Sequence, residues 1–199
     1  MIKIVADKDL PFLDKAFDYF EEIELLKLPY DQITNSNLKN ADALISRSVT
    51  KINEELVSDT NLKLIFSLTS GEDHVDFDCL EEIKFQSAKG SNAQAVFEYT
   101  ASALQFSSEK KIGIIGEGNI GKKIKDNLSF LGYEVISYDP YLYNHDESIK
   151  NAVLNCPIVS VNASYSRDGK YPSHELIENV LSDSLLINTS RGEVVNYKK

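Results

Sequence analysis

The sequence is poor in the residues that build metal and redox centres. Its 199 residues include two cysteines, three histidines, one methionine and no tryptophan. Cys79 and Cys156 lie far apart and show none of the close spacings of metal-binding or redox cysteine pairs. We therefore expect no metal site and two reduced, packed thiols, as in a cytoplasmic protein.

Long apolar runs and an excess of positive charge are also absent. No apolar run approaches the roughly 20 residues that cross a bilayer, and Met1 to Asp7 predicts a short strand, not a signal peptide. The formal net charge is −10, which argues against nucleic acids and anionic membrane surfaces as partners. With 42% hydrophobic residues, the chain has enough apolar side chains for a folded core.

One stretch, residues 111–140, has the order of elements of a dinucleotide-binding unit. The apolar run Ile112 to Ile115 predicts a buried parallel strand. It leads into the G-x-G-x-x-G loop 116–121, and apolar residues at helical spacing follow. Gly132 stands where a glycine that ends this helix is expected. A second predicted strand, residues 134–138, ends at Asp139, eighteen residues beyond the last glycine of the loop.

The glycines and the acid have separate physical roles. Gly116 permits a tight turn, Gly118 lets the backbone approach a pyrophosphate, and Gly121 allows close packing of helix and strand. The N-terminus of the new helix favours an anion, while Asp139 can accept hydrogen bonds from a ribose and would repel a 2′-phosphate. We therefore predict NAD as the cofactor, and the alternative is a glycine-rich structural turn. The predicted NAD contacts are Gly116, Gly118, Asn119, Ile120, Gly121 and Asp139.

Strands alternate with helices over the rest of the chain. Strands are expected at residues 2–5, 23–28, 41–46, 62–68, 85–87, 157–162 and 184–188, and helices at 10–20, 53–58, 77–83, 92–106, 146–154 and 173–181. This alternation predicts α/β architecture with parallel sheets and right-handed crossovers.

Five stretches give the chain a resemblance to a known family. They are residues 41–51 (ADALISRSVTK), 69–76 (TSGEDHVD), 92–99 (NAQAVFEY), the glycine loop and 186–195 (LINTSRGEVV). In this order they resemble the D-isomer-specific 2-hydroxyacid dehydrogenases, most closely the erythronate-4-phosphate dehydrogenase branch. The resemblance implies an NAD-dependent oxidation of a phosphorylated 2-hydroxy acid, 4-phosphoerythronate, to the 2-oxo acid in pyridoxal phosphate biosynthesis.

The resemblance also implies a domain organisation. It gives a flavodoxin-like substrate domain at residues 1–91, an interdomain helix or linker at 92–110, and a Rossmann NAD-binding domain at 111–199. The Rossmann domain is expected to be partial, because four strands are predicted after Lys110 and a full Rossmann sheet has six.

The same resemblance implies roles for individual residues. Arg191 matches the arginine that grips the substrate carboxylate. Ser48 and Thr69 match substrate-binding hydroxyls, for which strand-end capping is the alternative. Arg47, or Lys51, is expected to balance the substrate phosphate through charge-assisted hydrogen bonds.

One residue departs from the family pattern within the glycine loop. Glu117 stands where relatives usually have an apolar residue. We expect its side chain to point outward or to weaken pyrophosphate binding, with Lys123 offsetting its charge.

The family's catalytic glutamate and histidine come later in the chain than its arginine. No histidine follows Arg191 in these residues, and His74 is expected to be structural or part of the substrate wall. We therefore expect a chain truncated at its C-terminus, with impaired dehydrogenase activity. The alternative is a catalytically inactive NAD(H)-binding or remnant protein. Residues 184–188 are expected to form an exposed sheet edge, which predicts a homodimer.

Overall fold

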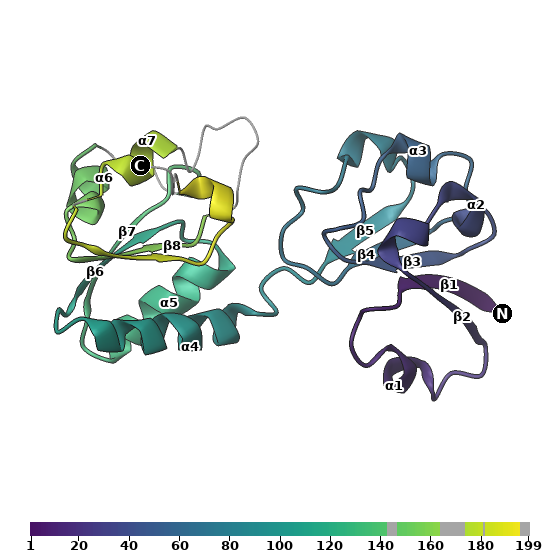
Figure 1. The fold of residues 1–199 in the computed structure, drawn as a ribbon, viewed down its shortest axis with the longest axis horizontal. Helices are drawn as coiled ribbons and strands as arrows, with labels where there is room; N and C mark the ends of the chain where they lie inside the picture. The colour runs from purple at the N-terminus through teal and green to yellow at the C-terminus, as the bar shows by residue number, and fades with distance from the viewer. Residues whose placement is uncertain (143–146, 164–173, 181, 196–199) are drawn as a thin grey trace. The chain divides into compact units, whose positions relative to one another are not determined.

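The chain folds into two compact units. The computed structural model describes residues 1–142, 147–163, 174–180 and 182–195. Its first unit comprises Met1–Lys89 and its second Gly90–Lys199 (Figure 1). Each unit contains a parallel sheet with helices packed against it, as the sequence predicts.

The first unit is built on a parallel sheet in the order β2-β1-β3-β4-β5. Its strands are β1 (Ile2–Asp7), β2 (Ile23–Leu28), β3 (Ala43–Ser46), β4 (Leu64–Ser67) and β5 (Lys84–Ser87). This is the flavodoxin-like order, so that prediction is confirmed. The strand order reverses between β1 and β3, and ligands of such sheets bind beyond the carboxyl ends of the strands at that point.

Short helices cover both faces of this sheet. They are α1 (Leu13–Phe17), α2 (Asn35–Leu38) and α3 (Glu54–Val57), with single 3-10 turns η1 (Tyr30–Gln32) and η2 (Phe77–Cys79). Leu10 and Leu13 pack with Ala6 on one face. Leu38 and Leu56 pack with Leu44 and Ile65 on the other face.

Two predicted helices of this unit are shorter than expected. The predicted helix 10–20 shrinks to α1, because Phe12 directly before it has a φ of 64°. The predicted helix 77–83 shrinks to η2, because Glu81 has a φ of 44°. Left-handed backbone is incompatible with a continuing α-helix. The predicted helix at 53–58 is observed as α3, and the Asn53 side chain caps it by accepting a hydrogen bond from Leu56 N.

The second unit has a parallel sheet in the order β7-β6-β8-β9 within the described residues. Its strands are β6 (Lys111–Ile115), β7 (Glu134–Tyr138), β8 (Ile158–Val161) and β9 (Leu185–Asn188). Its helices are α4 (Ala93–Ala103), η3 (Leu104–Phe106), α5 (Asn119–Phe130), α6 (Glu147–Leu154), α7 (His174–Glu178) and η4 (Gly192–Val194). The strand order reverses between β6 and β8.

Helices cover both faces of the second sheet. Helices α4 and α5 lie side by side on one face, and α6 and α7 lie on the other (Figure 1). Leu104, Ile124 and Leu128 pack on Ile112 and Ile158, while the opposite face of the sheet packs against α6 and α7. The predicted helix 92–106 is therefore observed as α4 and η3, within the second unit.

Helix α5 ends as the sequence predicts. Gly132 has a φ of 84°. Its N–H donates to Ser129 O at 3.1 Å, and the N–H of Tyr133 donates to Leu128 O at 3.0 Å. This pair of bonds is the Schellman motif, which turns the chain back into β7.

Candidate functional site

Two glycines of the 116–121 loop are required by the fold. Gly116 has a φ of 89°, and a Cβ there would lie 2.6 Å from Ala163 N, just beyond β8. A Cβ on Gly121 would lie 1.9 Å from the carbonyl oxygen of Gly116. The loop therefore closes tightly on itself and on the end of β8, and no larger residue fits at these two positions.

The third glycine lies in different surroundings. Gly118 is the exposed N-cap of α5, and a Cβ added to it would meet nothing within 4 Å. Its φ and ψ of −73° and −160° suit any residue, so neither the backbone nor packing requires glycine here. A glycine without a structural need fits a position that a ligand approaches closely.

The N-terminus of α5 has no side-chain cap from its N-cap residue. Gly118 has no side chain that could accept a hydrogen bond from the first turn. Asn119 is exposed, and Ile120 is half-buried against the core. The first N–H groups of the helix are thus available to an anion, and the helix dipole favours one.

Asp139 lies directly after β7 and is held by the backbone. Its Oδ2 accepts from Glu117 N at 2.8 Å and its Oδ1 accepts from Tyr141 N at 3.0 Å. Only 7% of the residue is exposed. These two bonds orient the carboxylate beside the glycine loop.

The side chain of Glu117 does not point outward, so that part of the expectation is wrong. Glu117 is buried, with Oε1 accepting from Lys125 Nζ at 2.9 Å and Oε2 accepting from the Ser137 hydroxyl. The cation that pairs with it is therefore Lys125 in the second turn of α5, not Lys123. A buried carboxylate needs such partners, because an unpaired one is strongly disfavoured.

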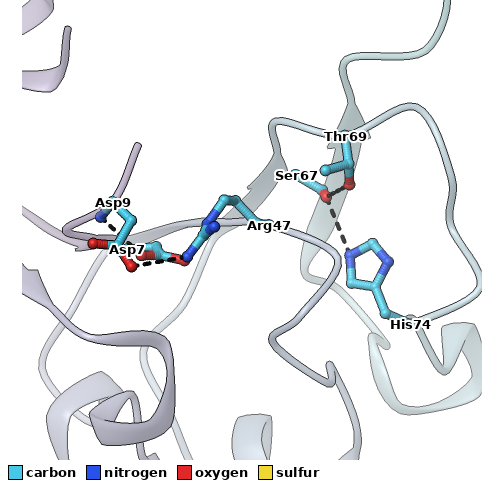
Figure 2. Close-up of polar contacts among 6 residues, drawn as sticks. All are labelled: Asp7, Asp9, Arg47, Ser67, Thr69 and His74. Carbon is cyan, nitrogen blue, oxygen red and sulfur yellow. Dashed lines mark hydrogen bonds and ion pairs between the residues drawn. The ribbon is translucent and has the colours of Figure 1, made fainter. Parts of the chain in front are cut away.

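In the first unit, Arg47 forms an ion-pair cluster across the reversal point of the sheet (Figure 2). It follows β3, and its Nε donates to Asp7 Oδ2 at 2.6 Å, at the end of β1. A second nitrogen, Nη2, donates to Asp9 Oδ2 at 3.1 Å. The hydrogen bond with Asp7 raises the pKa of Arg47 above its usual range. Two of its donors are thus already engaged within the protein.

A chain of polar groups follows the neighbouring strand β4 (Figure 2). The hydroxyl of Ser67 lies 2.9 Å from the hydroxyl of Thr69 and 3.1 Å from His74 Nε2. Ser67 and His74 are buried, and Thr69 is half-exposed. His74 therefore supports the half-exposed Thr69 hydroxyl through Ser67, in line with the structural role expected for it.

Ser48 lies in the turn after β3, the strand that neighbours β4 with its hydrogen-bonded polar groups. Ser46 and Ser67 are register partners in β3 and β4, so Ser48 and Thr69, each two residues further on, extend from the same edge of the sheet. Ser48 is half-exposed, and Lys51 is exposed. The structure thus brings the ends of β1, β3 and β4 together at one edge.

Arg191 follows β9 at the corresponding edge of the second sheet. Its carbonyl accepts from Asn188 Nδ2 at 3.0 Å, and Asn188 Oδ1 accepts from Ser190 N at 3.0 Å. Thr189 bridges to β8 by donating to Val161 O at 3.0 Å. These bonds fix the turn that presents Arg191, which is half-exposed.

The comparisons with known proteins identify the family. Residues 83–199 match the model described as D-isomer specific 2-hydroxyacid dehydrogenase, NAD binding domain. The chain belongs to this family. The resemblance inferred from the sequence is therefore confirmed, and so is NAD as the cofactor of the family's domain.

The curated relatives of this dehydrogenase family member include erythronate-4-phosphate dehydrogenases. The protein of this name from Hahella chejuensis is 40% identical over 98% of this chain and 55% of its own length. Its counterpart from Teredinibacter turnerae is 34% identical over 99% of this chain and 56% of its own length. The chain thus spans little more than half the length of these relatives.

Solved structures of 2-hydroxyacid dehydrogenases share the fold. The NAD+-bound 3-phosphoglycerate dehydrogenase of Entamoeba histolytica aligns with a TM-score of 0.78 at 23% identity, over 98% of this chain and 73% of its own. The D-lactate dehydrogenase of Aquifex aeolicus, complexed with NAD and lactic acid, aligns with a TM-score of 0.74 at 22% identity, over 98% of this chain and 70% of its own.

Several polar residues of these sites were not predicted from the sequence. Asp7, Ser67, Lys125 and Ser137 each hold a predicted site residue or Glu117 in place. Ser137 lies two residues before Asp139, and this period-2 spacing along a strand was the one available signal.

The described residues contain no group of histidine, cysteine or acidic residues arranged to hold a metal ion. No helix among them is long and apolar enough to cross a membrane.

Proposed function

We propose that the second unit binds NAD(H) at the glycine loop. The observation that supports this best is the contrast among the loop glycines. Gly116 and Gly121 are needed for packing, whereas Gly118 lies in open space at an uncapped helix N-terminus. A glycine that the fold does not need is explained by a pyrophosphate lying against the backbone at that point.

In this proposal the chain's own groups hold the cofactor by its phosphates and ribose. The N–H groups at the start of α5 donate to the pyrophosphate, assisted by the helix dipole. Asp139 accepts from a hydroxyl of the adenosine ribose, which favours NAD over NADP. Once bound, NAD supplies a nicotinamide ring that accepts a hydride from the carbon bearing the substrate hydroxyl.

We propose a phosphorylated 2-hydroxy acid, 4-phosphoerythronate, as the substrate. The support comes from the relatives named erythronate-4-phosphate dehydrogenase and from the half-exposed hydroxyls of Ser48 and Thr69. The predicted contact from Arg47 is the weakest of the set, because Asp7 and Asp9 already take two of its donors. Exposed Lys51 is the better candidate to balance a phosphate.

Arg191 has the proposed role of binding the substrate carboxylate. A guanidinium pairs with a carboxylate in a bidentate geometry that fixes its orientation. The turn of Asn188 and Ser190 holds the backbone at this arginine, which would limit the orientations of its side chain. Oxidation of the hydroxyl also requires a base that accepts its proton, a role that Arg191 does not fill. The three histidines of these 199 residues all precede Arg191 in the sequence.

The proposed location is the cytoplasm and the proposed assembly a homodimer. Neither cysteine forms a disulfide, which suits a reducing compartment. Strand β9 pairs with β8 and has no second neighbour among the described strands, so its outer backbone edge is a candidate contact between copies. Light scattering at micromolar concentration tests the dimer, and a monomer mass would contradict it.

The alternative is a chain that keeps the loop but no longer binds a cofactor. Calorimetric titration with NADH separates the two. Saturable heat that disappears in Gly118→Asp supports NAD(H) binding, since the new carboxylate would meet the pyrophosphate. No heat up to millimolar NADH supports the alternative.

A further inference from the structure

The glycine loop contains a carboxylate that the proposed NAD binding does not explain. Glu117 lies between Gly116 and Gly118, so it stands beside any pyrophosphate bound there. Its side chain is 5% exposed. A second acid buried next to an anion site weakens anion binding unless its charge is compensated.

The charge of Glu117 is compensated by a lysine of helix α5. Lys125 Nζ donates to Glu117 Oε1 at 2.9 Å and to the hydroxyl of Ser137 at 3.0 Å. The same hydroxyl donates to Glu117 Oε2. Two of the three ammonium hydrogens of Lys125 are therefore directed at the Glu117 and Ser137 side chains.

This cluster adjoins the ribose-binding acid. Ser137 and Asp139 lie two residues apart along the end of β7, so their side chains leave the strand on the same side. Glu117 is joined to both, by its side chain to Ser137 and by its N–H to Asp139 Oδ2 at 2.8 Å. Two carboxylates and one ammonium thus lie together at the end of β7, where the adenosine ribose is proposed to bind.

We propose that Glu117 is a second determinant of cofactor specificity, which excludes a 2′-phosphate by neutralising Lys125. This inference rests on the proposed NAD binding. Asp139 repels the 2′-phosphate directly, and Glu117 removes the lysine that would otherwise attract it. Asp139, Glu117 and Lys125 together carry a net charge of −1. Replacing Glu117 by an uncharged residue changes this net charge to 0.

Binding of NADH and NADPH to Glu117→Gln tests the inference. A unit charge acting on a dianionic phosphate within about 10 Å, at an effective dielectric between protein surface and water, changes the affinity about tenfold. We expect the NADPH-to-NADH affinity ratio to rise by about that factor, measured by calorimetry in low salt. The rise should shrink in high salt because the charges are screened.

Two further variants make the result specific. Asp126→Asn removes a negative charge from an exposed position of the same helix, and it should leave the ratio within twofold of wild type. Glu117→Gln combined with Lys125→Met should lose the gain in NADPH affinity, because the liberated ammonium is gone. A merely structural role of Glu117 would change stability or the affinity for both cofactors, not their ratio.

If Glu117→Gln does not fold, Glu117→Val provides the second test, since valine fills a buried position without a polar atom. An unchanged ratio in a folded variant that still binds NADH overturns this inference alone. No binding of NADH by the wild-type chain overturns the proposed function, and this inference with it.

Discussion

Replacing Arg47 with methionine tests whether its main role is structural. The side chain of Asp7 is fully buried, and its partner Arg47 is 31% exposed at an N–O distance of 2.6 Å. Removing one partner of a buried ion pair costs about 3–5 kcal/mol, because the other charge stays buried without compensation. Since Arg47 is partly exposed, we expect Arg47→Met to lower the free energy of unfolding by about 3 kcal/mol.

A second substitution should recover part of this loss. Asp7→Asn in the Arg47→Met background removes the buried charge, and the Asn oxygen can still accept the hydrogen bond that Asp9 N donates to Asp7 Oδ1. We expect about 1–2 kcal/mol to return. Urea denaturation followed by circular dichroism measures both values, because the chain has no tryptophan.

An exposed ion pair of the same unit supplies the control. Lys63 Nζ lies 2.7 Å from Asp42 Oδ1, and the lysine is 78% exposed. Lys63→Met should cost less than about 1 kcal/mol. A structural role of Arg47 is contradicted if Arg47→Met lowers the free energy of unfolding no more than Lys63→Met does. A stable Arg47→Met variant with weakened binding of 4-phosphoerythronate would restore Arg47 as a substrate ligand.

Three further predictions concern the loop, acid stability and turnover. Gly121→Ala should cost about 3 kcal/mol of stability, because its Cβ would overlap the Gly116 carbonyl. Gly118→Ala should cost under about 1 kcal/mol but should weaken NADH binding. Equal losses of stability for the two variants in urea denaturation would contradict this. The hydrogen bonds from Lys3 N and Lys63 lower the pKa of Asp42 below its ordinary 3.8, so its stabilisation is present above that pH and is lost as the pH falls through the lowered value. The difference in stability between wild type and Asp42→Asn should then disappear in acid. A purified polypeptide of these 199 residues should reduce NAD with 4-phosphoerythronate at background rate, since losing a catalytic base lowers the rate about 10²–10⁴-fold. Turnover clearly above background in a spectrophotometric assay would show that another group supplies the base.

The sequence predicted the order of elements because local signals are strong in this chain. Apolar runs gave the strands, the glycine loop gave the start of α5, and Gly132 gave its end. The failures came from backbone conformations that no periodicity reveals. Phe12 and Glu81 take positive φ values, which shortens two predicted helices, although neither residue type favours that region.

The side-chain partners within the sites were harder to predict. Glu117 and Lys125 are eight residues apart, and Arg47 and Asp7 are forty apart, so their pairing depends on how the strands are arranged. The sequence supplied the charged residues of both clusters but not their partners. It assigned Lys123 to Glu117, whereas Lys125 is the partner, and two positions that are two residues apart on a helix do not face the same side.

Calorimetric titration of the wild-type chain and of Gly118→Asp with NADH tests whether the glycine loop is the cofactor site. We expect saturable binding below millimolar NADH for the wild type and no binding for the variant, with similar melting temperatures for both. Absence of heat in the wild type, or equal binding by a folded Gly118→Asp, would contradict the assignment of this loop as the cofactor site.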